Sequence, residues 1–275
     1  MDLVLSPDFA RDRTLFVAGL EDGLRVSTDR GLTWHDAAAS LSGLPVHGVA
    51  VSAESASDPT VYLATSDGIR VSHDGGSTWH PVMAPLDGGE AIVLAVSPTY
   101  ANDRTIFVAT TASTETVVWR STDGGQAWHR WLVQSASGVT RVPLAVASSY
   151  AVDGVMFVGL GRRIFRPVRH AQEVRSGERR PIWQPAEVGT DVSGVTALAV
   201  SPAYGTDRTV FAATNAGVFV SRNGGERFEA WNKGLDPARM VSIAVSPEYP
   251  QDRLVYGLGL GGTVWRRRDL RAALP

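Results

Sequence analysis

Apolar residues occur along the chain in short runs, and turn-forming residues separate the runs. One typical series is residues 197–200, 209–213, 217–220 and 228–231, with Ser-Pro, Asn, Gly and Asp between them. Short runs rich in β-branched and aromatic residues, bounded by Gly, Pro, Asn and Asp, indicate β-strands. No stretch shows the 3.6-residue apolar period of an amphipathic helix, so the pattern predicts an all-β protein.

The runs belong to a repeat. The segment at 6–18, SPDFARDRTLFVA, returns at 97–109 as SPTYANDRTIFVA. Further copies keep an aspartate at the corresponding position, which gives the series Asp12, Asp58, Asp103, Asp153, Asp207 and Asp252. Self-similarity at a spacing of about 46 residues indicates a repeat architecture with six units.

Each unit contains four expected strands, and six such units predict a six-bladed β-propeller of four-stranded antiparallel blades. In the last unit, residues 264–269 align with a third strand, but no Gly-Gly turn follows. We therefore expect a short or incomplete sixth blade. The expected organisation is one domain over residues 1–275, with blades at about 1–46, 47–91, 92–140, 141–194, 195–240 and 241–275.

A second motif marks the turn between the third and fourth strands. It reads STDRGLTW at 27–34, SHDGGSTW at 72–79, STDGGQAW at 121–128 and SRNGGERF at 221–228. This S-x-D-x-G-x-T-W pattern resembles the Asp-box, or BNR, repeat of sialidases, sortilin-type receptors and related propellers.

The residue types of this motif suit a structural role. An Asp or Asn side chain can accept hydrogen bonds from backbone N–H groups two or three residues further on, and Gly supplies the positive φ of the turn. The aromatic residue then packs on the blade interior. We expect a structural role for Asp29, Trp34, Asp74, Trp79, Asp123, Trp128, Asn223 and Phe228.

Composition excludes several functional classes. The absence of cysteine excludes disulfides, thiolate metal sites and cysteine nucleophiles. The formal charge of −2 argues against nucleic-acid binding. Histidines lack metal-ligand spacing, so neither a metal nor a cofactor is expected. The sequence has no apolar stretch of membrane-spanning length and no signal peptide, which predicts a cytoplasmic protein by default or a processed secreted one.

Candidate functional residues remain once the repeat positions are set aside. In enzymes that resemble this fold, the active site lies on the face opposite the Asp-box turns. The carboxylates expected on that face as catalytic candidates are Asp67, Glu90, Glu115 and Asp191. The expected ligand-binding residues near the starts of innermost strands and in the links between blades are His47, Arg141, Asp236 and Arg239.

Sialidase activity would require a tyrosine nucleophile. All six tyrosines occupy repeat positions, in first turns or second strands. The sequence therefore favours a non-catalytic binding or scaffold propeller that recognises a protein or glycan on the loop face. The alternative is a glycoside hydrolase, sialidase-like or xyloglucanase-like, that uses rim carboxylates. Whether the protein is an enzyme stays open, with the balance against it, and its oligomeric state is not predicted.

One insertion interrupts the fourth unit. Residues 162–180 contain seven arginines and two glutamates, a local charge of +5. Arginine clusters suit phosphate, sulfate or carboxylate groups. A second alternative is therefore anion binding through this insertion, with Arg162, Arg163 and Arg166 as ligand-binding residues. The competing interpretation is a solvated loop on the outer part of one blade.

Overall fold

The structure, a computed structural model, describes residues 2–21, 23–37, 39–52, 59–135, 139, 141–173, 179–235 and 239–270. The chain divides into two compact units, residues 1–140 and 141–275. Each unit contains three antiparallel blades whose strands follow one another in chain order, and the last blade has three strands within the described residues. The predicted all-β fold of six propeller blades with an incomplete sixth is confirmed. That residues 1–275 form one domain stays a prediction.

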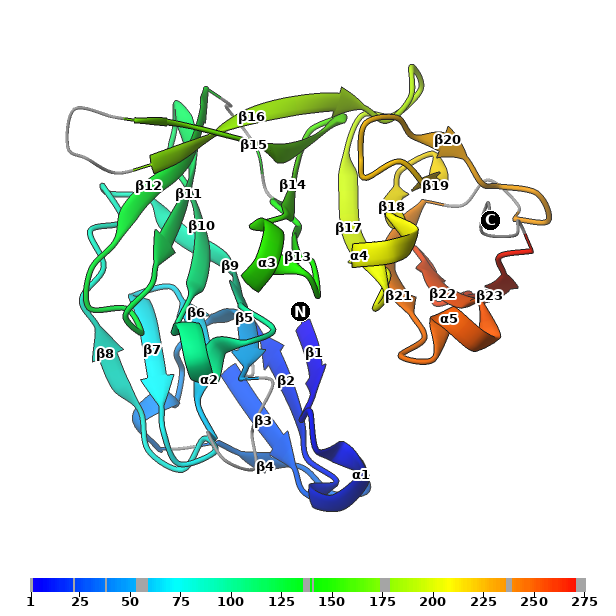
Figure 1. The fold of residues 1–275 in the computed structure, drawn as a ribbon. Coiled ribbons are helices and arrows are strands. Elements are labelled where there is room, and N and C mark those ends of the chain that lie inside the picture. Colours follow the sequence, from blue (N-terminus) through cyan, green and yellow to red (C-terminus); the bar gives the residue numbers. More distant parts are fainter. Residues whose placement is uncertain are drawn as a thin grey trace. The chain divides into compact units, whose positions relative to one another are not determined.

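Unit 1 contains blades 1 to 3, which lie side by side in Figure 1. Blade 1 consists of β1 (Asp2–Leu5), β2 (Leu15–Gly19), β3 (Gly23–Ser27) and β4 (His35–Asp36), and a 3-10 turn follows at Ala39–Leu41. Blade 2 consists of β5 (Val46–Val51), β6 (Val61–Thr65), β7 (Gly68–Ser72) and β8 (His80–Val82). Blade 3 consists of β9 (Glu90–Val96), β10 (Ile106–Thr111), β11 (Glu115–Ser121) and β12 (His129–Ser135).

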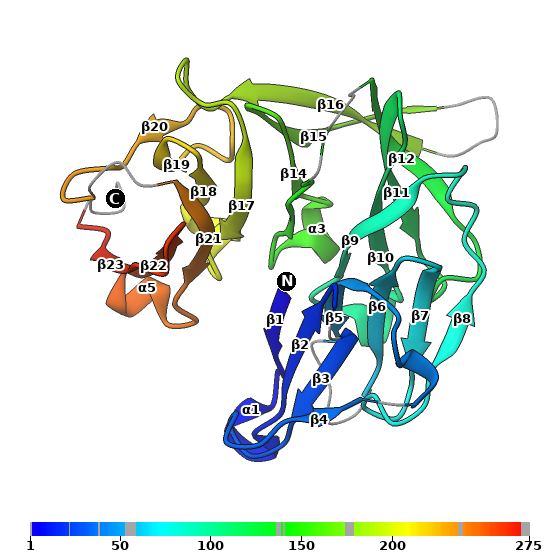
Figure 2. The ribbon, with the colours of Figure 1, turned by 180° about the vertical axis from the view of Figure 1, so that it is seen from behind.

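Unit 2 contains blades 4 to 6, coloured green to red in Figure 2. Blade 4 consists of β13 (Leu144–Val146), β14 (Met156–Leu160), β15 (Arg163–Glu173) and β16 (Arg179–Glu187). Blade 5 consists of β17 (Val195–Val200), β18 (Val210–Thr214), β19 (Gly217–Ser221) and β20 (Glu229–Ala230). Blade 6 consists of β21 (Met240–Val245), β22 (Leu254–Gly259) and β23 (Val264–Arg268).

In blades 1, 3, 4, 5 and 6, the connection between the first and second strands is a single helical turn. These turns are α1 (Phe9–Asp12), α2 (Tyr100–Asp103), α3 (Tyr150–Asp153), α4 (Tyr204–Asp207) and α5 (Tyr249–Asp252). In α2, the carboxylate of Asp103 accepts the Ser97 hydroxyl at 2.6 Å and the Thr105 N–H at 2.9 Å. Arg104 ends the turn with a left-handed φ of 49°, and its guanidinium lies 5.3 Å from the ring centre of Tyr100. The repeated Ser-Pro-x-Tyr-x-x-Asp-Arg sequence therefore builds both the helical turn and its end.

The hydrophobic core lies between neighbouring blades of each unit. Between blades 1 and 2, Phe16 and Leu24 pack against Val49 and Leu63, and all four side chains are buried. Between blades 5 and 6, Phe211 packs against the rings of Trp231 and Tyr249. Each fully buried large apolar side chain contributes about 1.5 to 3 kcal/mol of hydrophobic stabilisation. Adjacent blades are thus held together by the same alternating apolar positions that predicted the strands.

The described part of the insertion in blade 4 forms β-strands instead of a loop. β15 runs for 11 residues and pairs with β16 in an antiparallel hairpin, with a register shift between Val168 and Ala171. Figure 1 shows these two strands as the longest pair of unit 2. The physical reason is that the residues after Pro167 continue the ladder begun by Ile164 and Phe165 instead of leaving it.

Candidate functional site

The Asp-box turns share one hydrogen-bond pattern. In blade 2, Asp74 Oδ1 accepts the Ser72 hydroxyl at 2.7 Å and the N–H groups of Ser77 and Thr78 at 3.0 and 2.8 Å. The Ser72 hydroxyl oxygen in turn accepts the Gly76 N–H at 2.8 Å. The backbone donors lie three and four residues after the aspartate, slightly further along the chain than the sequence interpretation assumed.

The same turn forms at the other copies. The Ser hydroxyl lies 2.8 Å from Asp29 in blade 1, 2.7 Å from Asp123 in blade 3 and 2.8 Å from Asn223 in blade 5. Hydrogen bonds from Thr33 and Ser27 lower the pKa of Asp29 to about 2. Hydrogen bonds from Thr78 and Ser72 lower the pKa of Asp74 as well. These carboxylates remain ionised at neutral pH, and their oxygens are engaged by the turn.

The motif aromatics close the same turns. The indole N–H of each motif tryptophan donates to the carbonyl of the glycine three residues before it, at 3.1 Å from Trp34 to Gly31 and at 3.0 Å from Trp79 to Gly76. Trp128 makes the same bond to Gly125 at 3.0 Å. Trp79 and Phe228 are buried, whereas Trp34 is 37% exposed. Trp34 therefore fills its turn less completely than the other box aromatics do.

On the face of unit 1 opposite the Asp-box turns, Asp67 lies in the turn between β6 and β7. Its carboxylate accepts hydrogen bonds from the Thr65 hydroxyl at 2.6 Å and from Arg70 Nη2 at 2.5 Å. The Arg70 hydrogen bond is the largest cause that lowers the pKa of Asp67. Asp67 is thus held as an ionised, hydrogen-bonded carboxylate.

His47 and Glu90 meet on the same face. His47 is the second residue of β5, Glu90 is the first residue of β9, and His47 Nε2 lies 3.0 Å from Glu90 Oε1. The His47 side chain is mostly buried and Nε2 is not oriented for a hydrogen bond. The contact becomes an ion pair when the imidazole takes up a proton. The structure therefore brings together two residues that the sequence indicated separately.

Glu115 forms a third charged group on this face, with Arg130. Glu115 begins β11, and its Oε1 accepts a hydrogen bond from Arg130 Nη2 at 2.5 Å. The Arg130 guanidinium lies 5.7 Å from the ring centre of Trp119, and Arg130 Nε lies 3.8 Å from a carboxylate oxygen of Asp87. Arg130, in β12, thus lies between two carboxylates: that of Asp87, in the link before β9, and that of Glu115, at the start of β11.

Among the described residues of unit 2, the candidates do not form a comparable group. Arg141 Nη1 donates to the Val241 carbonyl at 3.4 Å, and Asp191 Oδ1 accepts only the Thr190 hydroxyl among the contacts described, at 3.4 Å. Arg239 directly precedes β21, and its backbone carbonyl accepts a hydrogen bond from the Leu260 N–H at 2.6 Å. Asp236 lies outside the described residues.

The arginines of the insertion have acidic or amide partners. Arg162 Nη2 and Arg163 Nε lie 3.2 and 3.7 Å from the same oxygen of Glu187. Arg166 Nη2 donates to Gln184 at 2.8 Å and to Glu226 at 3.0 Å. These guanidinium groups therefore stabilise the hairpin and its contact with the Asp-box turn of blade 5.

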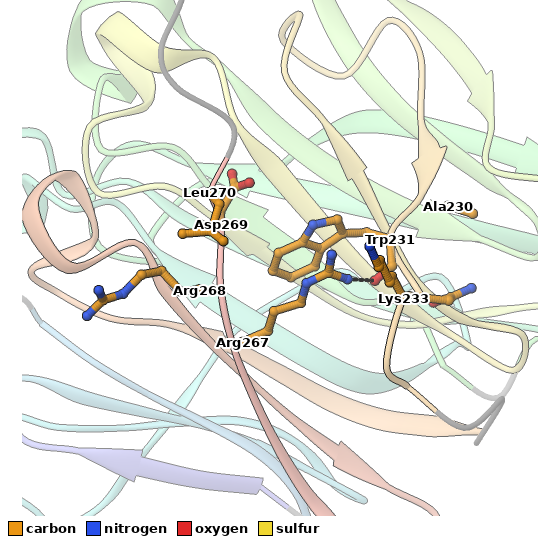
Figure 3. A pocket seen from close by; sticks show the side chains of 8 residues that line it. Ala230, Trp231, Lys233, Arg267, Arg268, Asp269 and Leu270 are labelled. Atoms are coloured by element: carbon orange, nitrogen blue, oxygen red, sulfur yellow. Dashed lines mark hydrogen bonds between the residues drawn. The ribbon is translucent and has the colours of Figure 1, made fainter.

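Two cavities in unit 2 lie away from the candidate carboxylates. One, of about 230 Å³, lies between blades 5 and 6 and is lined by Trp231, Lys233, Arg267 and Asp269, among others (Figure 3). The other, of about 300 Å³, lies beside the Asp-box turn of blade 5, between Arg166 and Arg208. Sequence reasoning missed these cavities and the partner arginines Arg70 and Arg130. Arg70 could have been found from the sequence, because it lies three residues after Asp67, in the strand that follows the turn. Arg130 carries no such signal.

Within the described part of the chain, no group of three or more His, Asp or Glu side chains has the arrangement of a metal site. The described helices are single turns, and none has the length or the apolar character needed to cross a membrane.

Residues 70–81 match the BNR/Asp-box repeat family, and they contain the Asp-box turn of blade 2. Curated proteins gave no match. Among solved structures, an ancestral GH74 enzyme aligns with 97% of this chain at 17% identity and a TM-score of 0.70. This chain spans 38% of that enzyme.

A structure of a nidogen/laminin complex aligns with 90% of this chain at 12% identity and a TM-score of 0.59, over 84% of the matched chain. The extracellular domain of a putative one-component system from B. thetaiotaomicron aligns with 93% of this chain at 13% identity and a TM-score of 0.64, over 31% of its length. These likenesses cover enzymes and binding assemblies, and at such identities they establish the fold alone. The chain is thus a β-propeller that contains a BNR/Asp-box repeat at residues 70–81.

Proposed function

We propose that this protein is a non-catalytic binding propeller that recognises a protein or glycan ligand through the loop face of unit 1, opposite the Asp-box turns. The observation that supports this best is the pairing of its carboxylates. Asp67 lies against Arg70, Glu115 against Arg130, and Glu90 against His47.

Glycoside hydrolysis usually requires one carboxyl group that stays protonated as a general acid. A carboxylate hydrogen-bonded to a guanidinium is stabilised in its ionised form, which opposes that role. Asp67 has such a partner, Arg70 Nη2, at 2.5 Å, and this hydrogen bond lowers the pKa of Asp67. Fixed, partly exposed ion pairs instead offer both donors and acceptors at defined positions, which suits recognition of a polar ligand.

The charged groups also lie on strand ends, which fixes their positions. Glu90 and Glu115 are the first residues of β9 and β11, and Asp67 precedes the first residue of β7. The Arg130 side chain is held between Glu115 and the Trp119 ring, and Trp119 itself donates to the Thr110 hydroxyl at 3.0 Å. A surface that is ordered before binding loses little conformational entropy when a ligand binds.

The test combines a hydrolysis screen with a binding screen. Fluorogenic glycosides, sialosides and β-glucan oligosaccharides are incubated with the purified chain, and the same chain is applied to a glycan array. We expect no turnover. A ligand found on the array binds at least about tenfold more weakly to Arg130→Gln and Glu115→Gln, because each substitution removes a charge-assisted hydrogen bond.

The matched control is Arg11→Gln, which removes a surface arginine from α1, outside the loop face. This control leaves binding unchanged. Turnover that disappears in Asp67→Asn or Glu115→Gln would contradict the proposal and support the glycosidase alternative. If no glycan on the array binds, the ligand to test is a protein. Cross-linking through a photoreactive residue placed at Asp67 tests for it, and the same residue placed at Arg11 is the control.

A further inference from the structure

Blade 6 ends in a strand with an unpaired outer edge. In the other five blades the third strand pairs on its outer side with a fourth strand. In blade 6, β23 pairs with β22 only, within the residues that the structure describes. An unpaired strand edge is a template to which an extended peptide can add by main-chain hydrogen bonds.

The hydrogen bonds around β23 show which of its backbone groups face this edge. The Asp269 N–H donates to the Arg253 carbonyl at 2.8 Å, and the Thr263 carbonyl accepts the Gly259 N–H at 2.9 Å, so both residues point their backbone groups toward β22. Backbone groups alternate along an antiparallel strand. Those of Val264, Arg266 and Arg268 therefore point toward the open edge.

The side chains at this edge are strongly cationic. Arg266 and Arg268 are exposed, and Lys233 and Arg267 line the adjacent cavity. Asp269 is buried and already receives the Arg222 guanidinium at 2.8 Å and the Tyr249 hydroxyl at 2.7 Å. Asp252 offsets part of the positive charge, since the Ser246 hydroxyl, the Leu254 N–H and the Arg268 charge lower its pKa.

The edge is also rigid. The Trp265 ring packs edge-on against Trp231, with ring centres 5.3 Å apart. The Arg267 guanidinium lies 4.4 Å from the centre of the Trp231 ring and donates to the Trp231 carbonyl at 3.0 Å (Figure 3). Figure 3 shows Arg268 extending away from Trp231, on the other side of the strand. β23 is therefore anchored to blade 5 through one face, while Arg266 and Arg268 project from the other.

We propose that β23 is a docking edge for an extended acidic peptide of a partner protein, which adds to blade 6 as its fourth strand. Main-chain hydrogen bonds form to Val264, Arg266 and Arg268. Directly opposed residues of antiparallel strands lie on the same face, so acidic side chains at alternate positions of the peptide contact Arg266 and Arg268. This surface lies in unit 2 and is separate from the loop face proposed above for ligand recognition.

The probe is a fluorescein-labelled peptide, acetyl-TEVEVET-amide, titrated with the full chain and followed by fluorescence anisotropy. We expect saturable binding that weakens as salt rises. The matched peptide with glutamine in place of each glutamate binds at least about tenfold more weakly, because it loses the paired charges.

Two variants of one residue separate backbone pairing from charge. Arg266→Gln removes a charge and keeps the N–H group, and we expect affinity to fall about threefold to fivefold, as for an exposed ion pair. Arg266→Pro also removes an N–H group from the open edge without removing a bond to β22, and we expect a loss of at least about tenfold. Arg11→Gln is the control and binds as the wild type does. Unchanged thermal unfolding shows that the folded state is retained in each variant.

Three results would overturn the proposal: no binding, equal binding of the glutamine peptide, or equal effects of Arg266→Pro and Arg266→Gln. A concentration-dependent dimer, measured by analytical ultracentrifugation and abolished by Arg266→Pro, would instead assign the edge to a second copy of the chain. None of these results bears on ligand binding at the loop face, so the two proposals fail independently.

Discussion

Tyr249, in α5, donates its hydroxyl hydrogen to Asp269 Oδ2 at 2.7 Å, and this bond joins the first turn of blade 6 to the end of β23. In blade 5 the equivalent hydroxyl, that of Tyr204, donates to the Gly224 carbonyl of the Asp-box turn at 3.3 Å. Asp269 therefore supplies in blade 6 the acceptor that a box backbone supplies in blade 5. Burial and the Asp269 carboxylate raise the pKa of Tyr249, so its hydroxyl stays a neutral donor at physiological pH.

Replacing Asp269 should destabilise unit 2. Asp269→Ala removes the acceptor for the Tyr249 hydroxyl and the partner of Arg222, whose Nη2 lies 2.8 Å from Asp269 Oδ1. Because both donors lose a partner in a mostly buried position, we expect the free energy of unfolding to fall by about 2 to 4 kcal/mol. Urea denaturation followed by tryptophan fluorescence measures this change.

Asp191→Ala is the control for that experiment, since Asp191 is exposed and accepts one hydroxyl at 3.4 Å. We expect its effect to stay within about 0.5 kcal/mol. Equal losses in the two variants would show that the Asp269 contacts do not stabilise blade 6.

The Asp-box carboxylates should make stability depend on acid pH. The pKa of Asp29 falls from 3.8 to about 2, chiefly because Thr33 and Ser27 donate hydrogen bonds to it. The unfolded chain therefore binds more protons than the folded chain between these two values. The stabilising contribution is complete above about pH 4 and is lost as the pH falls toward 2. Urea midpoints measured from pH 2 to pH 6 test this dependence.

Two substitutions test whether Asp29 is its source. Asp29→Asn keeps an acceptor oxygen but removes the titration, so the midpoint should fall less steeply below pH 4 than in the wild type. Thr33→Val removes the hydroxyl donor and should move the pKa of Asp29 back toward its ordinary value. Asn223 occupies the same position in blade 5 and accepts the Ser221 hydroxyl at 2.8 Å, so the asparagine turn should fold. Parallel pH curves for all three proteins would contradict the assignment.

Much of the fold could be predicted because the same pattern of strands and turns recurs along the chain. Apolar alternation in residues such as Phe211 and Ala213 marks the strand faces, and the box glycines mark the turns. The hairpin of blade 4 was missed because its polar residues carry no apolar alternation, and its β-structure comes from ladder hydrogen bonds. The spacing of the repeat could not indicate that β15 and β16 extend beyond the usual strand length.

The candidate site was predictable only in part. The sequence placed Asp67, Glu90 and Glu115 on the expected loop face, because each falls at a recognisable strand end. It could not indicate the partners: Arg130 is 15 residues from Glu115, and its reach across Trp119 depends on the side-chain path along β11. Asp269 was missed as well, because its partners Tyr249 and Arg222 lie 20 and 47 residues away.

The second glycine of the blade 5 box should tolerate no side chain. Gly225 has a φ of +86°, and a Cβ atom there would lie 2.5 Å from Cε1 of the buried Phe157 ring. Gly225→Ala should therefore lower the free energy of unfolding by about 2 to 4 kcal/mol, through backbone strain and overpacking. Gly75 also has a positive φ, +71°, but a Cβ atom there has no neighbour within 4 Å. Gly75→Ala should cost about 1 kcal/mol, and an equal cost at both positions would exclude the Phe157 contact as the cause.

The ionisation of Asp67 should depend on Arg70. The Arg70 hydrogen bond is the largest cause of the lowered pKa of Asp67, and the Thr65 hydroxyl adds a second hydrogen bond. Arg70→Leu keeps the apolar part of the side chain and removes the guanidinium, so the pKa of Asp67 should rise, because burial then acts with less opposition. Carboxyl ¹³C NMR titration of the wild type and the variant measures the shift directly.

Thr65→Val provides the comparison for this titration. It removes the weaker donor and should raise the pKa of Asp67 by less than Arg70→Leu does. If Arg70→Leu left the pKa of Asp67 unchanged while Thr65→Val raised it, the ion pair with Arg70 would not be what lowers the pKa of Asp67. Asp67 would then again be a candidate general acid. The argument for recognition over glycoside hydrolysis would lose the support of the Asp67–Arg70 pair.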